Sequence, residues 1–280
     1  MTNPYNLISI VMSVFNGEQF LRTSVESMLN QTYINFEFII VNDGSVDNTF
    51  NILKKYAKKD LRIKIINNDK NIGLTKSLNK GLKIAKGKFI ARMDADDISL
   101  PERLEKQLSF MEIHSEIGAV GCWYYLIDKY NKIIKECRPP RKYSKIKKAL
   151  IKKAIINSVP LIHPGLMIRK DALEKINFYD ENFIYAQDRD LLFRILKYYK
   201  IAVVPEILFK LRISDKSISA KNEIEQKKYC IMAKRRAINI GIYPKHYYIY
   251  IFIDYILLNL PWPINIIKKT ILKKLGIRKL

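Results

Sequence analysis

The 280-residue sequence is poor in cysteine and in acidic residues. Its three cysteines, at positions 122, 137 and 230, are odd in number and follow no metal-binding spacing. This pattern fits free thiols in a reducing cytoplasm better than a disulfide framework. Lysine and arginine number 50 against 27 aspartates and glutamates, which gives a net charge of +23. Such an excess favours an anionic partner: nucleic acid, an anionic membrane face or an anionic small substrate.

Long hydrophobic runs are also missing. The first residues lack the basic segment of a signal peptide, and the apolar run that follows them is too short. A membrane span needs about 20 apolar residues. The best candidate, at 247–263, is interrupted by Asp254, Asn259 and two prolines. We therefore expect neither a secretion signal nor a membrane-spanning helix.

Two glycine-rich phosphate motifs are absent as well. No G-x-G-x-x-G follows the first apolar run, and no G-x-x-x-x-G-K-[ST] occurs in the chain. The usual dinucleotide fingerprint and phosphate loop are thereby excluded. The chain does contain 48% hydrophobic and 11% aromatic residues, which is ample for a packed core and excludes global disorder.

Strand and helix patterns alternate through the first hundred residues. Apolar runs at 7–14, 36–41, 62–66 and 88–93 predict buried strands, and helical stripes lie between them. This order is typical of an open, mostly parallel α/β sheet with helices on both faces, whose ligands lie beyond the carboxyl ends of the strands. We expect the residues that follow the four strands to meet at one edge. They are Phe15 and Asn16, Asp43, Asn71 and Gly73, and Asp94 and Asp96.

The acidic run at 94–97 is the central functional signal. Asp94, Asp96 and Asp97 place three carboxylates within four residues, directly after a predicted buried strand. Such like charges repel one another, so a hard divalent cation shared with a phosphate-bearing substrate is a natural partner. Taken alone, so short a motif more often marks a solvated turn. The convergence of four strand ends favours a site. Ser99 predicts the cap of the next helix.

Residues 220–280 have a different character. After Glu225, twelve basic residues accompany a single acid, Asp254. Aromatic and aliphatic residues lie between the basic clusters, which predicts a basic amphipathic helical extension associated with an anionic membrane surface. The alternative is a helical cap packed on the catalytic domain. Nucleic acid is disfavoured because the basic residues interleave with long aliphatic ones.

Three long motifs occur in order. They are S-V-F-N-G-E-Q-F-L at 13–21, Q-T-Y at 31–33 with F-E-F-I-I-V-N-D-G-S-V-D-N-T at 36–49, and D-A-D-D-I-S-L-P-E-R-L-E-K-Q at 94–107. With them, residues 6–219 resemble the inverting family 2 glycosyltransferases of GT-A fold that build bacterial surface polysaccharides. The resemblance implies a Rossmann-like, mostly parallel sheet flanked by helices. Residues 1–97 would form its nucleotide-sugar-binding half and 98–219 its acceptor-binding half.

The donor-binding residues follow from the strand ends and the motifs together. The resemblance implies that Asp43 accepts from the nucleotide base and that His163 lies near the donor diphosphate. We expect a nucleoside diphosphate sugar, with a UDP-sugar as the first candidate. The expected donor-binding set is Phe15, Glu18, Asp43, Asn71, Gly73, Asp94 and His163.

The resemblance also implies a metal and a base. Asp94 and Asp96 would bind Mg²⁺ or Mn²⁺, and Asp188 would be the general base, although an acid at a helix start is more often only a cap. Two positions depart from the family. Gln187 replaces the usual Glu, and Ser214 replaces a histidine, which puts any metal or phosphate contact there in doubt. The Q-x-x-R-W of processive synthases is absent, which favours transfer of a single sugar.

We therefore expect an inverting transferase that moves one sugar to a hydroxyl of a glycan or lipid-linked acceptor, in the cytoplasm at the inner face of the plasma membrane. One alternative is a metal-dependent nucleotidyltransferase, which normally has a basic glycine-rich loop after the first strand that residues 15–18 do not supply. The other is a non-catalytic membrane-docking or nucleic-acid-binding protein, which would leave the converging acids unexplained.

Overall fold

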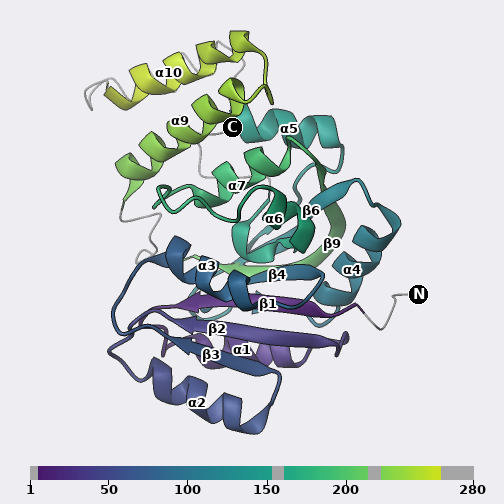
Figure 1. Ribbon diagram of the computed structural model, residues 1–280, viewed down its shortest axis with the longest axis vertical. Coiled ribbons are helices and arrows are strands. Elements are labelled where there is room, and N and C mark those ends of the chain that lie inside the picture. Colours follow the sequence, from purple (N-terminus) through teal and green to yellow (C-terminus); the bar gives the residue numbers. More distant parts are fainter. Residues whose placement is uncertain (1–5, 153–160, 214–221, 260–280) are drawn as a thin grey trace.

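The computed structural model describes residues 6–152, 161–213 and 222–259. The strands in these ranges are β1 (Ile8–Val14), β2 (Phe36–Asn42), β3 (Ile63–Asn67), β4 (Phe89–Asp94), β5 (Ile98–Ser99), β6 (Ile117–Ile127), β7 (Ile133–Cys137), β8 (Met167–Arg169) and β9 (Lys200–Arg212). They form one nine-stranded sheet in the order β3-β2-β1-β4-β8-β6-β9-β5, with β7 paired to β6 (Figure 1).

Helices cover both faces of this sheet. They are α1 (Leu21–Leu29), α2 (Thr49–Lys59), α3 (Leu74–Ile84), α4 (Arg103–Ile113), α5 (Tyr143–Lys152), α6 (Lys170–Lys175), α7 (Gln187–Ile195), α9 (Glu223–Asn239) and α10 (Tyr248–Asn259), with short 3₁₀ turns η1 (His163–Gly165) and η2 (Lys245–Tyr247). Apolar residues of α1, α2 and α4 share one core with the sheet. Those of α3, α5, α6, α7 and α9 share the core on the opposite face.

Four parallel strands end level with one another. Val14 pairs with Asn42, and Asn42 pairs with Asn67, so β1, β2 and β3 finish side by side. Ser13 pairs with Asp94 at the end of β4. The convergence of four strand ends on one edge is therefore confirmed. Beyond β4, strand β8 is antiparallel to both its neighbours, and β6 and β9 are again parallel to each other.

The start of α4 differs from the prediction. Ser99 is not a helix cap: it lies in β5 and pairs with Phe209 of β9. The helix begins at Arg103, after the N-cap residue Glu102. Ser99 is thus part of a long-range strand pair, although the local sequence pattern predicts it as the cap of the helix.

The C-terminal helices extend the molecule at the end remote from α2 (Figure 1). Helix α9 packs against α7, and α10 packs against α9. Within α9, Ala233 and Ala237 are fully buried. Residues 223–259 are therefore helical and packed on the rest of the domain, and their association with a membrane surface stays a prediction. None of the helices in the described ranges is long and apolar enough to cross a membrane. Residues 260–280, with half of the twelve basic residues, and Ser214 lie outside the described residues.

Candidate active site

Three carboxylates lie together at the carboxyl end of β4. Oxygen atoms of Asp94, Asp96 and Asp97 all lie within 4.8 Å of one another. Asp97 is 1% exposed; its Oδ1 accepts from the backbone amide of Arg212 at 2.8 Å, and its Oδ2 has no hydrogen-bond partner in the described structure. Burial, and then the charge of Asp94, raises the pKa of Asp96 to about 6. Burial also raises the pKa of Asp97 well above its ordinary value.

Two arginines border this cluster. Arg92 is 2% exposed and donates to a carboxylate oxygen of Asp94. Arg212 donates to the backbone carbonyls of Asp96 and Asp128, each at 2.7 Å. When all three carboxylates are ionised, the two cations leave one negative charge uncompensated, and the raised pKa values of Asp96 and Asp97 reflect the cost of that state. Oxygen-only ligands, one of them an unpartnered buried atom, suit a hard divalent cation such as Mg²⁺ or Mn²⁺.

Asp43 organises the loop that follows β3. It is 2% exposed, and its carboxylate accepts from the side chain of Asn68 at 2.9 Å and from the backbone amides of Ile72 at 2.9 Å and Gly73 at 3.0 Å. The neighbouring Gly44 has φ of +69°, and a Cβ there would lie 2.4 Å from the backbone of Lys70. The loops after β2 and β3 therefore pack backbone to backbone, with Asp43 between them.

The loop after β1 is tied to the loop after β2. Glu18 accepts from the backbone amide of Asn48 at 2.9 Å, next to the start of α2, and its own amide donates to Asp47 at 3.1 Å. Phe15 is 49% exposed. Asn71 is also exposed and accepts from the amide of Gly73 at 3.0 Å. The structure therefore shows a bracing contact for Glu18, and donor binding by these residues stays a prediction.

His163 lies in η1, which packs against β4. Its Nε2 is 2.7 Å from the hydroxyl of Tyr179. Burial lowers the pKa of His163 well below its ordinary value, and the charge of Arg92 lowers it further. A neutral imidazole cannot attract an anion by charge, but it can donate one hydrogen bond from one ring nitrogen.

Asp188 occupies the first turn of α7. The N-cap of this helix is Ala186, in the left-handed conformation with φ of 52°, so Asp188 is not the cap residue itself. Burial raises the pKa of Asp188, opposed chiefly by the charge of Arg189. Burial also raises the pKa of Tyr179, to which the charges of Asp188 and Asp94 both contribute. The expected base and the expected metal ligand thus share one neighbour.

The sequence matches a known family model along more than half of its length. The model described as "Glycosyl transferase family 2" matches residues 9–177. The chain belongs to this family. This family 2 glycosyltransferase is 40% identical over 227 residues to an uncharacterised glycosyltransferase of Methanocaldococcus jannaschii, covering 80% of this chain and 76% of that protein. It is 38% identical over 193 residues to the O-antigen biosynthesis glycosyltransferase WbnJ of Escherichia coli, covering 68% and 72%.

Solved structures share the fold of this glycosyltransferase. The mannosyltransferase PcManGT of Pyrobaculum calidifontis, in complex with GDP-Man and Mn²⁺, superposes with a TM-score of 0.67 at 15% identity, covering 100% of this chain and 83% of that one. Residues 1–349 of S. aureus TarS, in complex with UDP-GlcNAc, give 0.65 at 19% identity, covering 86% and 69%. The expected GT-A fold and the family resemblance are confirmed.

Sequence reasoning missed three side chains at this site of the glycosyltransferase. Asp97 belongs to the acidic run, but the family resemblance assigns the metal to Asp94 and Asp96 alone. Arg92 had a usable signal, since a charged residue in a buried strand needs a buried partner. Tyr179 had none, because its contact with His163 depends on how two loops are placed in three dimensions.

Proposed function

We propose that this enzyme transfers one sugar from a nucleoside diphosphate donor, with a UDP-sugar as the first candidate, to a hydroxyl of a glycan or lipid-linked acceptor, with inversion at the anomeric carbon. The observation that carries the proposal is the cluster of three buried or half-buried carboxylates at the edge where four strands end. Relatives named for O-antigen and amylovoran biosynthesis support a polysaccharide precursor as the acceptor. Fold neighbours in complex with UDP, UDP-GlcNAc or GDP-Man support the donor class.

The chemistry follows from where charge develops. When the bond from the anomeric carbon to the phosphate oxygen breaks, negative charge collects on the leaving diphosphate. A divalent ion held by Asp94 and Asp96 would neutralise this charge as a Lewis acid. Arg92 holds the carboxylate of Asp94 in place, and Asp97 ties the acidic loop to β9 through the amide of Arg212.

The acceptor hydroxyl must lose its proton as it attacks. Asp188 is the proposed base, and its raised pKa makes it a stronger base than an exposed aspartate. A positioned general base contributes about 10²–10⁴-fold to the rate. Attack on the face opposite the diphosphate gives inversion in a single displacement.

The test is release of nucleoside diphosphate from a panel of UDP- and GDP-sugars, with and without EDTA. We expect turnover with one donor class and its loss in EDTA. Asp188→Asn should lower kcat by at least about 10²-fold while leaving donor binding nearly intact. The matched control is Asp171→Asn, which changes an exposed acid in the first turn of α6. Pyrophosphate release would instead identify a nucleotidyltransferase, and inactivity with every donor would favour a docking protein.

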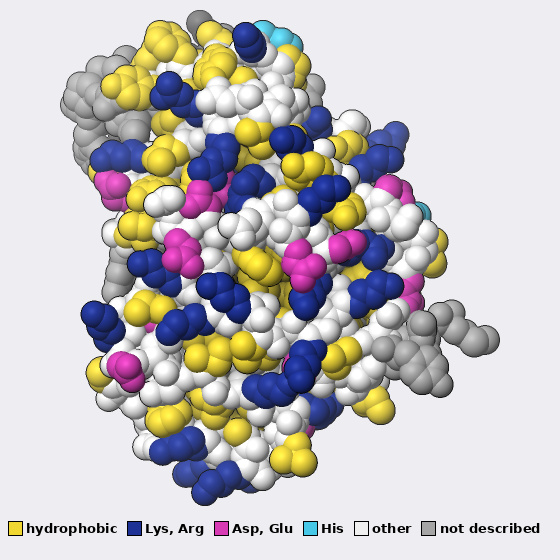
Figure 2. Space-filling model, in the orientation of Figure 1, with side chains coloured by type: hydrophobic (Ala, Val, Ile, Leu, Met, Phe, Trp, Pro, Cys, Tyr) yellow, Lys and Arg dark blue, Asp and Glu magenta, His cyan; other side chains and the backbone are white. Residues whose placement is uncertain are grey.

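We propose further that α10 rests on an anionic membrane surface at the inner face of the plasma membrane. The exposed residues among positions 248–256 of this helix are spaced by three or four positions along it and so share one face. They are Tyr248, Ile249, Phe252, Tyr255 and Ile256. Figure 2 shows apolar side chains gathered over α10, with Lys and Arg side chains nearby. Such a face, on a chain of net charge +23, suits the interface of an anionic bilayer.

A further inference from the structure

The contact between His163 and Tyr179 joins two buried rings. The two residues are 9% and 5% exposed, the Nε2 to hydroxyl distance is 2.7 Å, and the rings meet edge to face with centroids 5.6 Å apart. Because burial lowers the pKa of His163 and raises that of Tyr179, the imidazole is neutral and the phenol keeps its proton. One hydrogen therefore lies between them.

The direction of this hydrogen bond follows from the partners available. If Nε2–H donated to the tyrosine oxygen, the phenolic hydrogen of Tyr179 would need another acceptor, and the described residues provide none. A buried hydroxyl without an acceptor is costly. Donation from the tyrosine to Nε2 satisfies both groups and puts the ring proton of His163 on Nδ1. Across the described part of the chain, Nδ1 has no hydrogen-bond partner, so this N–H is available to a ligand.

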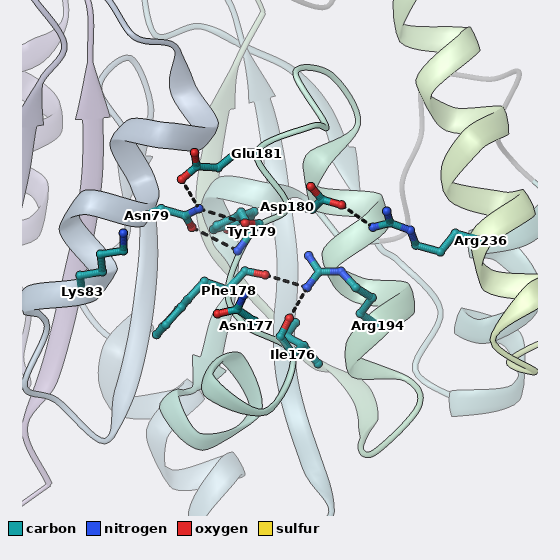
Figure 3. A pocket seen from close by; sticks show the side chains of 10 residues that line it. All are labelled: Asn79, Lys83, Ile176, Asn177, Phe178, Tyr179, Asp180, Glu181, Arg194 and Arg236. Carbon is teal, nitrogen blue, oxygen red and sulfur yellow. Dashed lines mark hydrogen bonds and ion pairs between the residues drawn. The ribbon is translucent and has the colours of Figure 1, made fainter.

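Asn79 of α3 holds the backbone of Tyr179 from the other side. Its side-chain nitrogen donates to the carbonyl of Tyr179 at 2.9 Å, and its oxygen accepts from the amide of Tyr179 at 3.1 Å. Figure 3 shows this pair bordering a pocket of about 360 Å³ between α3, residues 176–181, α7 and α9. None of the acids expected at the active site, which are Glu18, Asp43, Asp94, Asp96 and Asp188, lines this pocket. Two hydrogen bonds from Asn79 therefore hold the backbone of Tyr179 beside this pocket.

The turn before Tyr179 is equally constrained. Asn177 and Phe178 both have φ of +57°, which few non-glycine residues adopt. Their amides donate to the carbonyls of Glu174 and Leu173 at 3.0 and 2.9 Å, which is the Schellman ending of a helix. Arg194 donates to the carbonyl of Phe178 at 2.7 Å (Figure 3).

We propose that Tyr179, held by Asn79, is a positioning residue that keeps His163 as the Nδ1–H tautomer, so that Nδ1–H is the hydrogen-bond donor offered to the diphosphate of the sugar nucleotide. The identity of the ligand rests on the proposed function. The tautomer does not, because it is a property of the protein without substrate.

The tautomer is read directly from long-range ¹H–¹⁵N spectra of histidine-labelled protein. The chain has only three histidines, and His163→Asn assigns the signal. We expect a neutral Nδ1–H ring at pH 7. Tyr179→Phe should give a mixture of tautomers, and Asn79→Asp a smaller change in the same direction. The control is Tyr243→Phe, which removes a hydroxyl of similar burial whose 2.7 Å hydrogen bond to the carbonyl of Lys147 lies elsewhere.

An Nε2–H ring or an imidazolium in the unaltered protein would overturn the proposal, as would an unchanged spectrum in Tyr179→Phe. If that variant does not fold, the unaltered protein still decides the tautomer. Failure to transfer any sugar would sink the proposed function and leave this result intact.

A second measurement compares two replacements of His163. The amide nitrogen of Asn lies as far from Cβ as Nδ1 does, whereas that of Gln reaches the position of Nε2. We expect His163→Asn to keep a donor KM within a few-fold of the original and His163→Gln to raise it about tenfold or more, with a smaller change in kcat. The opposite ranking would refute donation from Nδ1.

Discussion

The ion pair between Lys234 of α9 and Asp254 of α10 gives a stability prediction with a calculable ceiling. Nζ and Oδ2 are 2.7 Å apart, and the side chains are 0% and 6% exposed. Burial lowers the pKa of Lys234 and raises that of Asp254, and the charge of each partner opposes the effect. Asp254→Asn would leave a buried ammonium without its carboxylate. Removing one member of a buried pair costs about 3–5 kcal/mol of stability.

The cost cannot grow without limit, because Lys234 can give up its proton instead. From an unperturbed pKa of about 10.4, deprotonation at pH 7 costs about 4.6 kcal/mol, at about 1.4 kcal/mol per pH unit. Once Lys234 is neutral in the folded variant, the unfolded chain binds one proton more, so stability rises with pH. At pH 9 the ceiling falls to about 2 kcal/mol. A deficit of about 3 to 4.6 kcal/mol for Asp254→Asn at pH 7 should therefore fall to about 2 kcal/mol or less at pH 9.

Urea unfolding followed by helical circular dichroism at the two pH values measures this deficit. The control is Glu225→Gln, which breaks the pair with Lys228, also 2.7 Å long but with side chains 54% and 47% exposed. Exposed pairs are worth about 0–1 kcal/mol, so this variant should change little at either pH. Replacing both buried partners, as Lys234→Met with Asp254→Leu, should restore most of the stability. A deficit below about 1 kcal/mol for Asp254→Asn, or one independent of pH, would refute the reasoning.

Three further predictions concern the reaction and the membrane. Because burial raises the pKa of Asp188 and a base must be ionised, kcat/KM should fall on acidification at a higher pH than an exposed aspartate would give; an acid limb at about 3.9 or below would contradict this. After EDTA treatment, Mn²⁺ should restore the transferase activity of the unaltered enzyme and of the control variant Glu116→Gln, which replaces an exposed acid. Mn²⁺ should not restore the activity of Asp96→Asn. Restored activity in that variant would exclude Asp96 as a ligand. Phe252→Asp should weaken sedimentation with anionic vesicles several-fold, whereas Leu61→Asp, at a 93% exposed apolar position, should not; equal effects would refute docking through α10.

The parallel half of the sheet could be predicted because each strand carries its own signal. Runs such as Ile8–Val14 are buried along their whole length, so composition alone reports them. Strand β5 could not be predicted in this way. It is two residues long, and it exists because Ser99 and Ile98 pair with Phe209 and Lys210 more than a hundred residues later. When that partner strand is not considered, the local sequence predicts Ser99 as the cap of the following helix.

In the candidate site, too, some residues could be predicted from the local sequence and others could not. Asp94, Asp96 and Asp97 could be found because their mutual repulsion is already present in the sequence, where nothing nearby offsets three adjacent charges except Arg92. The sequence did not reveal Tyr179 as the partner of His163 or Lys234 as the partner of Asp254. Tyr179 meets His163 where Asn79, a hundred residues earlier, holds its backbone, and Lys234 contacts Asp254 only when α10 packs back on α9. Single charged residues within apolar surroundings, such as Arg92 and Asp254, were the available signals for such partners. Each is buried in the structure beside a group of opposite charge, because an isolated charge there would be too costly. For this chain, an unpaired charge in an apolar run is therefore better interpreted as half of a contact than as an interruption.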